Sequence, residues 1–327
     1  MGIKNGSTGH QNRRRGSFHG LGITSVLALT IAGATSTPSN AYTAAGDRNF
    51  PAQLILPQIG PTDSLWIPIS TQPMEAAARK EPTRQTDFTG NYSKLITEQL
   101  GIQLGYGLTQ LDRLLASPVT GAQNFDALLR YEAILDPDHE FLLSVQVGHE
   151  FGGTGDPGVG SDKHGATTPG ITFGKGLGDL PIGYWRPLAI TGFAGFEIGE
   201  GVRTNLVQDG ISIQYSMPYL VSKVANVDMP AFLRGMTPMT EVFFTTPVSH
   251  ITRTHVTSQS ANTTLVVAPG VSYSRGSGWE LGIEAMIPTT RATGSGIGVI
   301  AQLVVELDYL APDSILGRPL FPSAESP

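Results

Sequence analysis

Apolar and polar residues alternate along most of the chain from residue 88 onward. In the run Leu100–Thr109 every second residue is large and apolar, and only Gly, Gln and Thr stand between them. Successive side chains of a strand point to opposite faces, so the pattern predicts strands with one apolar and one polar face. It predicts eleven of them, at residues 88–96, 100–112, 124–135, 139–151, 168–177, 186–199, 210–222, 239–249, 264–275, 278–288 and 296–309.

The length of these predicted strands indicates the environment of their apolar face. They last roughly 10–13 residues, whereas strands of soluble proteins average about 5–6 and a tilted strand needs about 9–11 to cross a membrane. A soluble sandwich would show the same alternation with its apolar face turned inward. The strand length favours an antiparallel up-and-down transmembrane β-barrel, an all-β fold.

The connections between the strands predict a twelfth strand. Tight turns follow the first, third and tenth strands, and long loops follow the second, fourth and eighth, as in outer-membrane barrels. A chain that enters from the periplasm then needs one more strand before residue 88. We expect it within Ala52–Ile69, with Ser70–Thr86 as its outer loop, which gives twelve strands; ten is the alternative.

The N-terminus has the layout of a secretory signal peptide, which predicts export. Lys4 and Arg13–Arg15 precede an apolar stretch, Leu21–Ala34, that is too short to span a bilayer, and Ser39-Asn40-Ala41 places small residues before a cleavage site. We therefore expect a signal peptide at 1–41, an N-terminal segment at 42–85 with the first strand, a barrel at 86–310 and a Pro-rich tail at 311–327.

Composition narrows the function classes. Removing the four basic residues of the leader from the total of 21 leaves 17 against 27 acidic ones, a net charge of −10. Such an acidic chain is a poor general partner for nucleic acid. It has no Cys, which excludes disulfides, thiolate-bound zinc and a thiolate nucleophile.

The polar faces carry the candidate functional residues. If the apolar faces meet lipid, eight acidic residues and one basic residue line the lumen: Asp126, Arg130, Glu132, Glu150, Glu197, Glu241, Glu280, Glu284 and Glu306. One interpretation is a conduit that favours cations, because a cleft of one charge sign concentrates counter-ions. The other is a narrow, filled lumen in which these acids pair with Arg130, Lys175 and Arg186.

Two stretches resemble a known family. Gly176-Leu177-Gly178-Asp179-Leu180 precedes a long alternating strand, and the closing stretch Tyr273–Gly294 contains Gly276-Ser277-Gly278-Trp279-Glu280 and Pro288-Thr289-Thr290-Arg291. Together they resemble the meta-pathway phenol-degradation family of outer-membrane proteins, over residues 86–310. The resemblance implies a transporter-type barrel that passes small hydrophobic or aromatic compounds, and it supplies no functional residue. The Pro-rich end after Tyr309 departs from barrels that end on an aromatic residue.

No motif points to catalysis, a cofactor or a metal. His250 and His255 lie five apart, and Gly294-Ser295-Gly296 lacks the full nucleophile elbow, as does Gly276-Ser277-Gly278. We expect no enzyme but a channel or transporter for small molecules in the outer membrane, with lipids as its partners. The alternative is a structural or surface-interaction barrel with a filled lumen.

Overall fold

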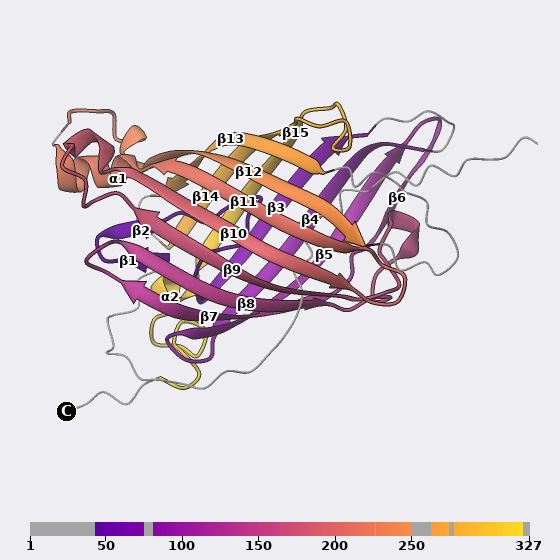
Figure 1. Ribbon diagram of the computed structural model, residues 1–327, viewed down its shortest axis with the longest axis horizontal. Coiled ribbons are helices and arrows are strands. Elements are labelled where there is room, and N and C mark those ends of the chain that lie inside the picture. The colour runs from indigo at the N-terminus through magenta and orange to yellow at the C-terminus, as the bar shows by residue number, and fades with distance from the viewer. Residues whose placement is uncertain (1–42, 75–80, 226, 250–262, 275–277, 323–327) are drawn as a thin grey trace, which may run out of the picture.

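Twelve antiparallel strands form a closed barrel in the computed structural model, which describes residues 43–74, 81–225, 227–249, 263–274 and 278–322 (Figure 1). Each strand pairs with its neighbour along the chain, and β15 pairs with β3 from Val299↔Thr71 to Glu306↔Ser64, which closes the cylinder. The wall consists of β3 (Ser64–Pro73), β4 (Pro82–Leu95), β5 (Leu100–Arg113), β7 (Asp126–Asp136), β8 (Phe141–Glu150), β9 (Ala166–Gly176), β10 (Leu188–Gly199), β11 (Asn205–Tyr215), β12 (Met236–Ser249), β13 (Thr264–Ser274), β14 (Trp279–Pro288) and β15 (Gly298–Glu306).

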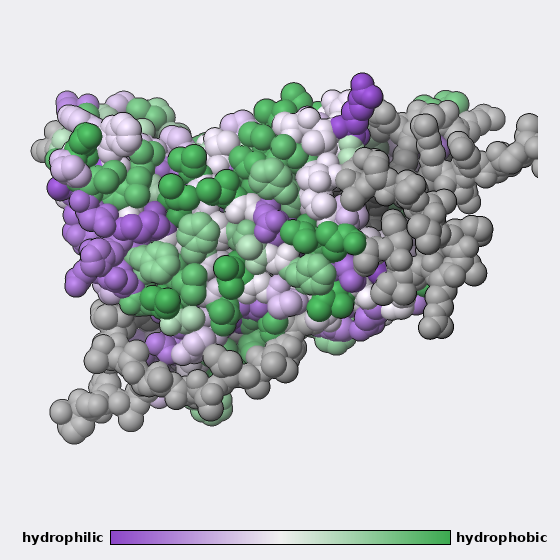
Figure 2. All heavy atoms as spheres, in the orientation of Figure 1, coloured by the Kyte–Doolittle hydropathy of each residue, from purple (hydrophilic) through white to green (hydrophobic). Residues whose placement is uncertain are grey.

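The wall strands are 9 to 14 residues long, and each has two distinct faces. On β14, for example, Leu281 and Ile283 are about half exposed, whereas Glu280 and Glu284 are buried. Exposed large apolar side chains occur on strands around the barrel. Figure 2 shows apolar residues across the middle of the strands on the face that it draws. The prediction of a twelve-stranded barrel with its apolar face outward is confirmed.

The two ends of the barrel differ. The β4–β5, β7–β8 and β13–β14 connections lie at one end, which we call the turn end; the connections after β5, β8 and β12 lie at the other, the loop end. At the loop end β6 (Ala116–Ala122) extends β5 as a hairpin, and η1 (Pro157–Val159) lies in the β8–β9 loop.

The turn end carries further short elements. The β9–β10 connection holds η2 (Gly183–Trp185), and the chain ends beyond α2 (Leu307–Leu310). The β11–β12 connection spans 216–235 and holds α1 (Met217–Tyr219), η3 (Leu220–Val224) and η4 (Leu233–Gly235), so this turn-end connection is longer than the tight turns nearby. A small hairpin of β1 (Thr43–Ala45) and β2 (Arg48–Phe50) also lies at this end (Figure 1).

Several strand boundaries differ from those expected. β11 ends at Tyr215 rather than 222, because Ser216 caps a helical turn whose first residues include Pro218. β15 ends at Glu306, so Tyr309 lies in α2. The largest difference concerns Ala52–Ile69: only Ser64 onward belongs to the wall, and β4 already begins at Pro82.

Some expectations fall outside the described residues. These are the signal peptide at 1–41 and almost all of the His250–Thr263 loop with its two histidines. In the part of the chain that is described, no helix has the length and apolar character needed to cross a bilayer.

Candidate functional site

Residues 51–63, here called the internal segment, run through the inside of the barrel instead of forming part of its wall. Gln53, Leu54, Leu56 and Ile59 are each at most 3% exposed. The segment contacts lumen-facing residues from strands on opposite sides of the cylinder, as described below. It therefore occupies the lumen.

Prolines explain why this segment does not pair as a strand. Pro51, Pro57 and Pro61 lack the backbone N–H that a sheet ladder needs. The segment instead obtains its hydrogen bonds from side chains of the wall. Buried backbone groups almost always have a partner, so each such wall side chain marks a point of attachment.

Glu241 on β12 provides the strongest attachment. Its Oε1 accepts a hydrogen bond from the backbone N–H of Leu54, and its Oε2 accepts from those of Ile55 and Leu56, all at 2.8 Å. Glu241 is fully buried. One carboxylate thus satisfies three consecutive amides, and charge-assisted bonds of this kind are stronger than neutral ones.

Neighbouring strands extend this attachment toward the turn end. Glu280 on β14 accepts a hydrogen bond from the Ala52 N–H at 3.0 Å, and the Gln302 side chain on β15 donates to the Ala52 carbonyl at 2.8 Å. The Trp66 indole donates to Gln302 at 2.6 Å and orients its amide. Ala52 therefore has both of its backbone groups bound.

The opposite side of the lumen holds the later part of the segment. Arg130 on β7 donates to the Gly60 carbonyl at 3.2 Å and to the Gln146 side chain at 3.0 Å. Thr172 on β9 donates to the Ile59 carbonyl at 2.9 Å. The segment is thus tied to both sides of the cylinder.

Apolar packing accompanies the hydrogen bonds. Leu54, Ile55 and Leu56 form one buried cluster with six wall residues, and Ile59 with Phe50 forms a second cluster near the turn end. The first cluster takes these residues from β10, β12, β13 and β15: Phe193, Met239, Phe243, Val266, Ala268 and Ile300. We call the lumen-facing side chains of β10 and β12–β15 the receiving wall.

Glycines on the lumen face leave room for the segment. A Cβ atom at Gly210 would lie 2.1 Å from Leu56 Cδ2, and one at Gly282 would lie 2.8 Å from Leu54 Cδ1. A Cβ at Gly174 would lie 2.6 Å from Ile59 Cδ1. The wall and the segment are complementary in shape, because real Cβ atoms do not approach other atoms this closely.

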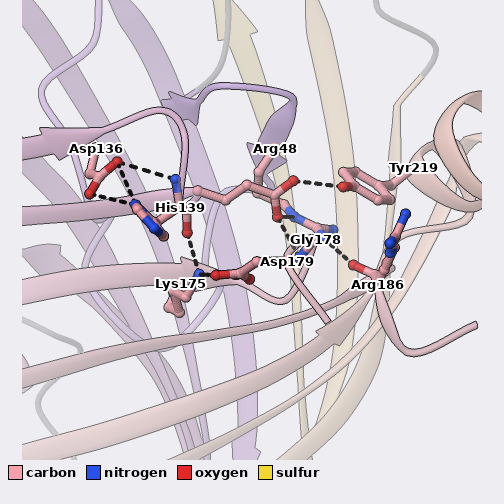
Figure 3. A network of polar contacts seen from close by, with 9 residues as sticks. Arg48, Asp136, His139, Lys175, Gly178, Asp179, Arg186 and Tyr219 are labelled. Atoms are coloured by element: carbon pink, nitrogen blue, oxygen red, sulfur yellow. Dashed lines mark hydrogen bonds and ion pairs between the residues drawn. The ribbon is translucent and has the colours of Figure 1, made fainter. Parts of the chain in front are cut away.

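A buried ion pair fixes the β1–β2 hairpin at the turn end. Arg48 Nε lies 3.2 Å from Glu140 Oε2, with both side chains at most 7% exposed, and Arg48 also donates to the Pro187 carbonyl. The Tyr219 hydroxyl donates to Glu140 at 2.7 Å, so three distant parts of the chain meet here (Figure 3). Burial lowers the pKa of Arg48, against the opposing effect of Glu140, and burial together with Glu140 raises the pKa of Tyr219 to about 12.

The other end of the internal segment is fixed by Asp63. Its carboxylate lies 2.5 Å from Lys94 Nζ and accepts the Leu95 N–H at 2.7 Å. Burial raises the pKa of Asp63, while Lys94 and the Leu95 N–H oppose that shift. The segment therefore has an attachment at each end as well as those along its length.

The loop end has a separate polar network. Arg203, from the β10–β11 loop, lies 2.6 Å from Glu150 and 2.8 Å from Glu197. Gln208 donates to Glu197 at 2.8 Å. Burial lowers the pKa of Arg203, but the bonds to the two carboxylates outweigh burial and leave the pKa raised.

The nine residues proposed to line the lumen do not form one continuous acidic path. Glu241 and Glu280 bind the internal segment, Glu150 and Glu197 bind Arg203, and Arg130 binds the segment from the opposite side. The remaining four are buried Asp126, Glu284 and Glu306, and partly exposed Glu132.

The expected pairing of these acids with Lys175 and Arg186 is wrong. Lys175, near the end of β9, pairs with Asp179 at 3.0 Å and donates to the His139 carbonyl (Figure 3). Arg186 donates to the Leu180 carbonyl. Both cations lie at the turn end and are bound there rather than by the acids of the lumen.

Glu284 differs from the other acids of the receiving wall. It is 1% exposed, and among the described residues neither of its carboxylate oxygens has a hydrogen-bond partner. Within the same residues no group of three or more His, Asp or Glu side chains is arranged to hold a metal ion.

Comparisons with known proteins do not identify a family for the chain. No protein-family model and no curated protein matches the chain. The resemblance to the phenol-degradation family is therefore not confirmed.

Solved structures that are similar to the chain are outer-membrane barrels. The COG4313 outer membrane channel from Pseudomonas putida F1 is 11% identical, with a TM-score of 0.49 over 79% of this chain and 99% of that one. The KdgM and NanC porins are 9% and 7% identical, with TM-scores of 0.45 and 0.46, each over 74% of this chain and 98% of theirs.

Proposed function

We propose that this protein is an outer-membrane channel or transporter for small molecules, and that the internal segment closes its lumen. The observation that carries the proposal is the way in which the segment is held. It is attached by side-chain hydrogen bonds and packing, not by strand pairing, so it can leave while the ladder of the barrel stays intact.

The apolar belt and the two ends support the membrane setting. Lipid-facing apolar residues and short turns at one end are the pattern of outer-membrane barrels. We place the turn end in the periplasm, where an exported N-terminus enters. In this Cys-free chain, Pro137→Cys should resist an impermeant thiol reagent on whole cells, whereas Gly158→Cys should be labelled; the reverse result would contradict this orientation.

The functional test releases the segment without changing the wall. Leu54→Ser with Leu56→Ser removes two buried apolar side chains, and truncations of this kind cost about 2–5 kcal/mol each. Purified full-length protein is placed in planar bilayers, and the current in KCl is recorded. We expect sustained current from the double serine variant and much less from wild type.

Two matched variants serve as controls. Leu54→Met with Leu56→Met keeps apolar volume and should behave as wild type. Leu56→Cys with Gly210→Cys should form a disulfide, because a Cβ at Gly210 lies against the Leu56 side chain, and oxidation should suppress current. Folded serine variant that carries no current would favour the alternative, a structural barrel with a filled lumen.

A further inference from the structure

The receiving wall has the chemistry of a ligand site as well as that of a contact surface. We infer that Glu241, Glu284 and the apolar side chains around them form a recognition site for small amphiphilic cations, meaning solutes with an ammonium or guanidinium group and a branched apolar body. Leu54–Leu56 occupy this site in the closed state as a substitute ligand. The inference rests on the proposed function and names its solute class.

The hydrogen bonds of Glu241 define the polar part of the ligand. This carboxylate accepts three N–H donors from one short stretch of chain, each at 2.8 Å. An alkylammonium group offers three N–H donors and no acceptor, and a guanidinium offers five. When the segment leaves, a buried carboxylate without donors is costly, so the site favours a ligand that replaces them.

Glu284 adds a second, unused carboxylate. Glu241 is opposite Ala268 and Glu284 is opposite Gly270, so the two acids flank β13 only two residues apart. A Cβ at Gly270 would lie 2.4 Å from Glu284 Cγ, so the Glu284 side chain occupies the space above that glycine. The neutral amides of the segment satisfy Glu241 and leave Glu284 unpartnered, whereas a cation beside Glu241 would also lie near the Glu284 carboxyl and favour its charged form.

The apolar cluster defines the body of the ligand. Leu54 and Leu56 place branched aliphatic side chains among Phe193, Phe243 and Ile300 of the receiving wall. Burial of such groups is worth roughly 1.5–3 kcal/mol each, so the pocket favours a solute with a comparable body. A small inorganic cation would leave the apolar part empty, and an organic anion would be repelled by the two acids.

Binding is measured on the purified, full-length double serine variant. Isothermal titration calorimetry in detergent compares 3-methylbutylammonium, 3-methylbutanoate and methylammonium, which separate the effects of charge and body. We expect 3-methylbutylammonium to bind at least tenfold more tightly than either of the others. It should also block the KCl current of this variant at lower concentration than they do.

Substitutions then locate the site. In the same background Glu241→Gln and Glu284→Gln should each weaken 3-methylbutylammonium binding about tenfold. Asp87→Asn, which changes a buried acid of β4 on another part of the lumen, should leave the binding unchanged. The heat-modifiable mobility of each variant on gels verifies that it is folded.

The outcomes separate the two proposals. Equal binding of 3-methylbutylammonium and 3-methylbutanoate would overturn the recognition site, even if the variant conducts. Binding of 3-methylbutylammonium that Glu284→Gln does not weaken would overturn it as well. Selective amine binding without any current would support the site and count against the channel. Calorimetry gives an answer in either case, because it does not depend on conduction.

Discussion

The lumen faces of β4 and β5 differ from the receiving wall in how their polar groups are satisfied. Around Asp87 of β4 the side chains bind one another: Asp87 accepts from Thr109 of β5 at 2.6 Å, from Gln85 of β4 at 2.9 Å and from Gln123, just after β6, at 3.1 Å. On the receiving wall, Glu241 and Glu280 bind backbone groups of the internal segment, and Glu284 has no hydrogen-bond partner within the described chain. The network around Asp87 is complete without the internal segment, whereas the receiving wall is complete only when something occupies it.

This difference shows where the barrel can change state. A self-contained network stabilises the strands that carry it and gains nothing from a ligand. A wall whose carboxylates and apolar side chains depend on a separable segment exposes an attractive surface when the segment leaves. The comparison can be tested with four kinds of substitution.

The largest effect is expected from Glu241→Ala. It leaves three buried N–H donors without an acceptor, at a cost of about 1–3 kcal/mol for each. Hydrogen exchange followed by mass spectrometry should show that the amides of residues 54–56 lose protection, while the barrel strands keep theirs. Asp87→Ala is the control on the self-contained wall and should leave residues 54–56 protected. Unchanged protection in Glu241→Ala would remove the distinction between the walls.

The next effect concerns the hairpin that precedes the segment. Arg48→Ala leaves Glu140 buried without its cation, and breaking a buried pair costs about 3–5 kcal/mol. We expect the amides of residues 43–50 to exchange faster and the midpoint of urea unfolding in vesicles to fall. Arg318→Ala removes an exposed pair with Asp313 and an exposed hydrogen bond to the Pro312 carbonyl, and it should have no measurable effect. Equal behaviour of the two variants would show that the hairpin is not held by Arg48.

On the outside, the two walls should behave alike. Leu104 on β5 and Ile283 on β14 both face outward and are exposed. Leu104→Arg and Ile283→Arg should each destabilise the barrel by about 2–4 kcal/mol if these positions lie at mid-membrane depth. The yield of folded, heat-modifiable barrel measures this effect. Tolerance of arginine at one position but not at the other would mean that the walls differ outside as well as inside.

The smallest effect is expected from a glycine of the lumen face. Gly210→Ala places a methyl group against Leu56, and overpacking of this kind costs about 1–3 kcal/mol. It should increase hydrogen exchange at residues 54–56 less than Glu241→Ala does. At Gly90, on the outer face of β4, the nearest atom to an added Cβ is 3.9 Å away, so Gly90→Ala is the control without close packing and should be neutral. No difference between the two glycines would contradict close packing between Leu56 and the wall.

The sequence contained one indication that the lumen is filled. Leu128, Leu142, Phe193, Met239 and Phe243 are apolar, yet they stand in the phase of their strands that otherwise holds the polar residues. A water-filled lumen has no use for large buried apolar groups, so such residues indicate that something packs against them. The regular alternation of apolar and polar residues around them is the stronger pattern, so these five exceptions are easily overlooked in the sequence.

The sequence by itself determined the barrel, because alternation with period two and the spacing of turns are local properties of each strand. It determined which face meets lipid and all but the first of the strands. Only the tertiary structure decided the path of residues 51–63, since their prolines prevent strand pairing and their partners on the barrel wall lie between 31 and 250 residues away along the chain. The tertiary structure also decided that Glu241 binds backbone amides while Glu284 has no hydrogen-bond partner among the described residues. Both are glutamates on the lumen face of their strands, and they differ only in the groups that the closed cylinder places next to them.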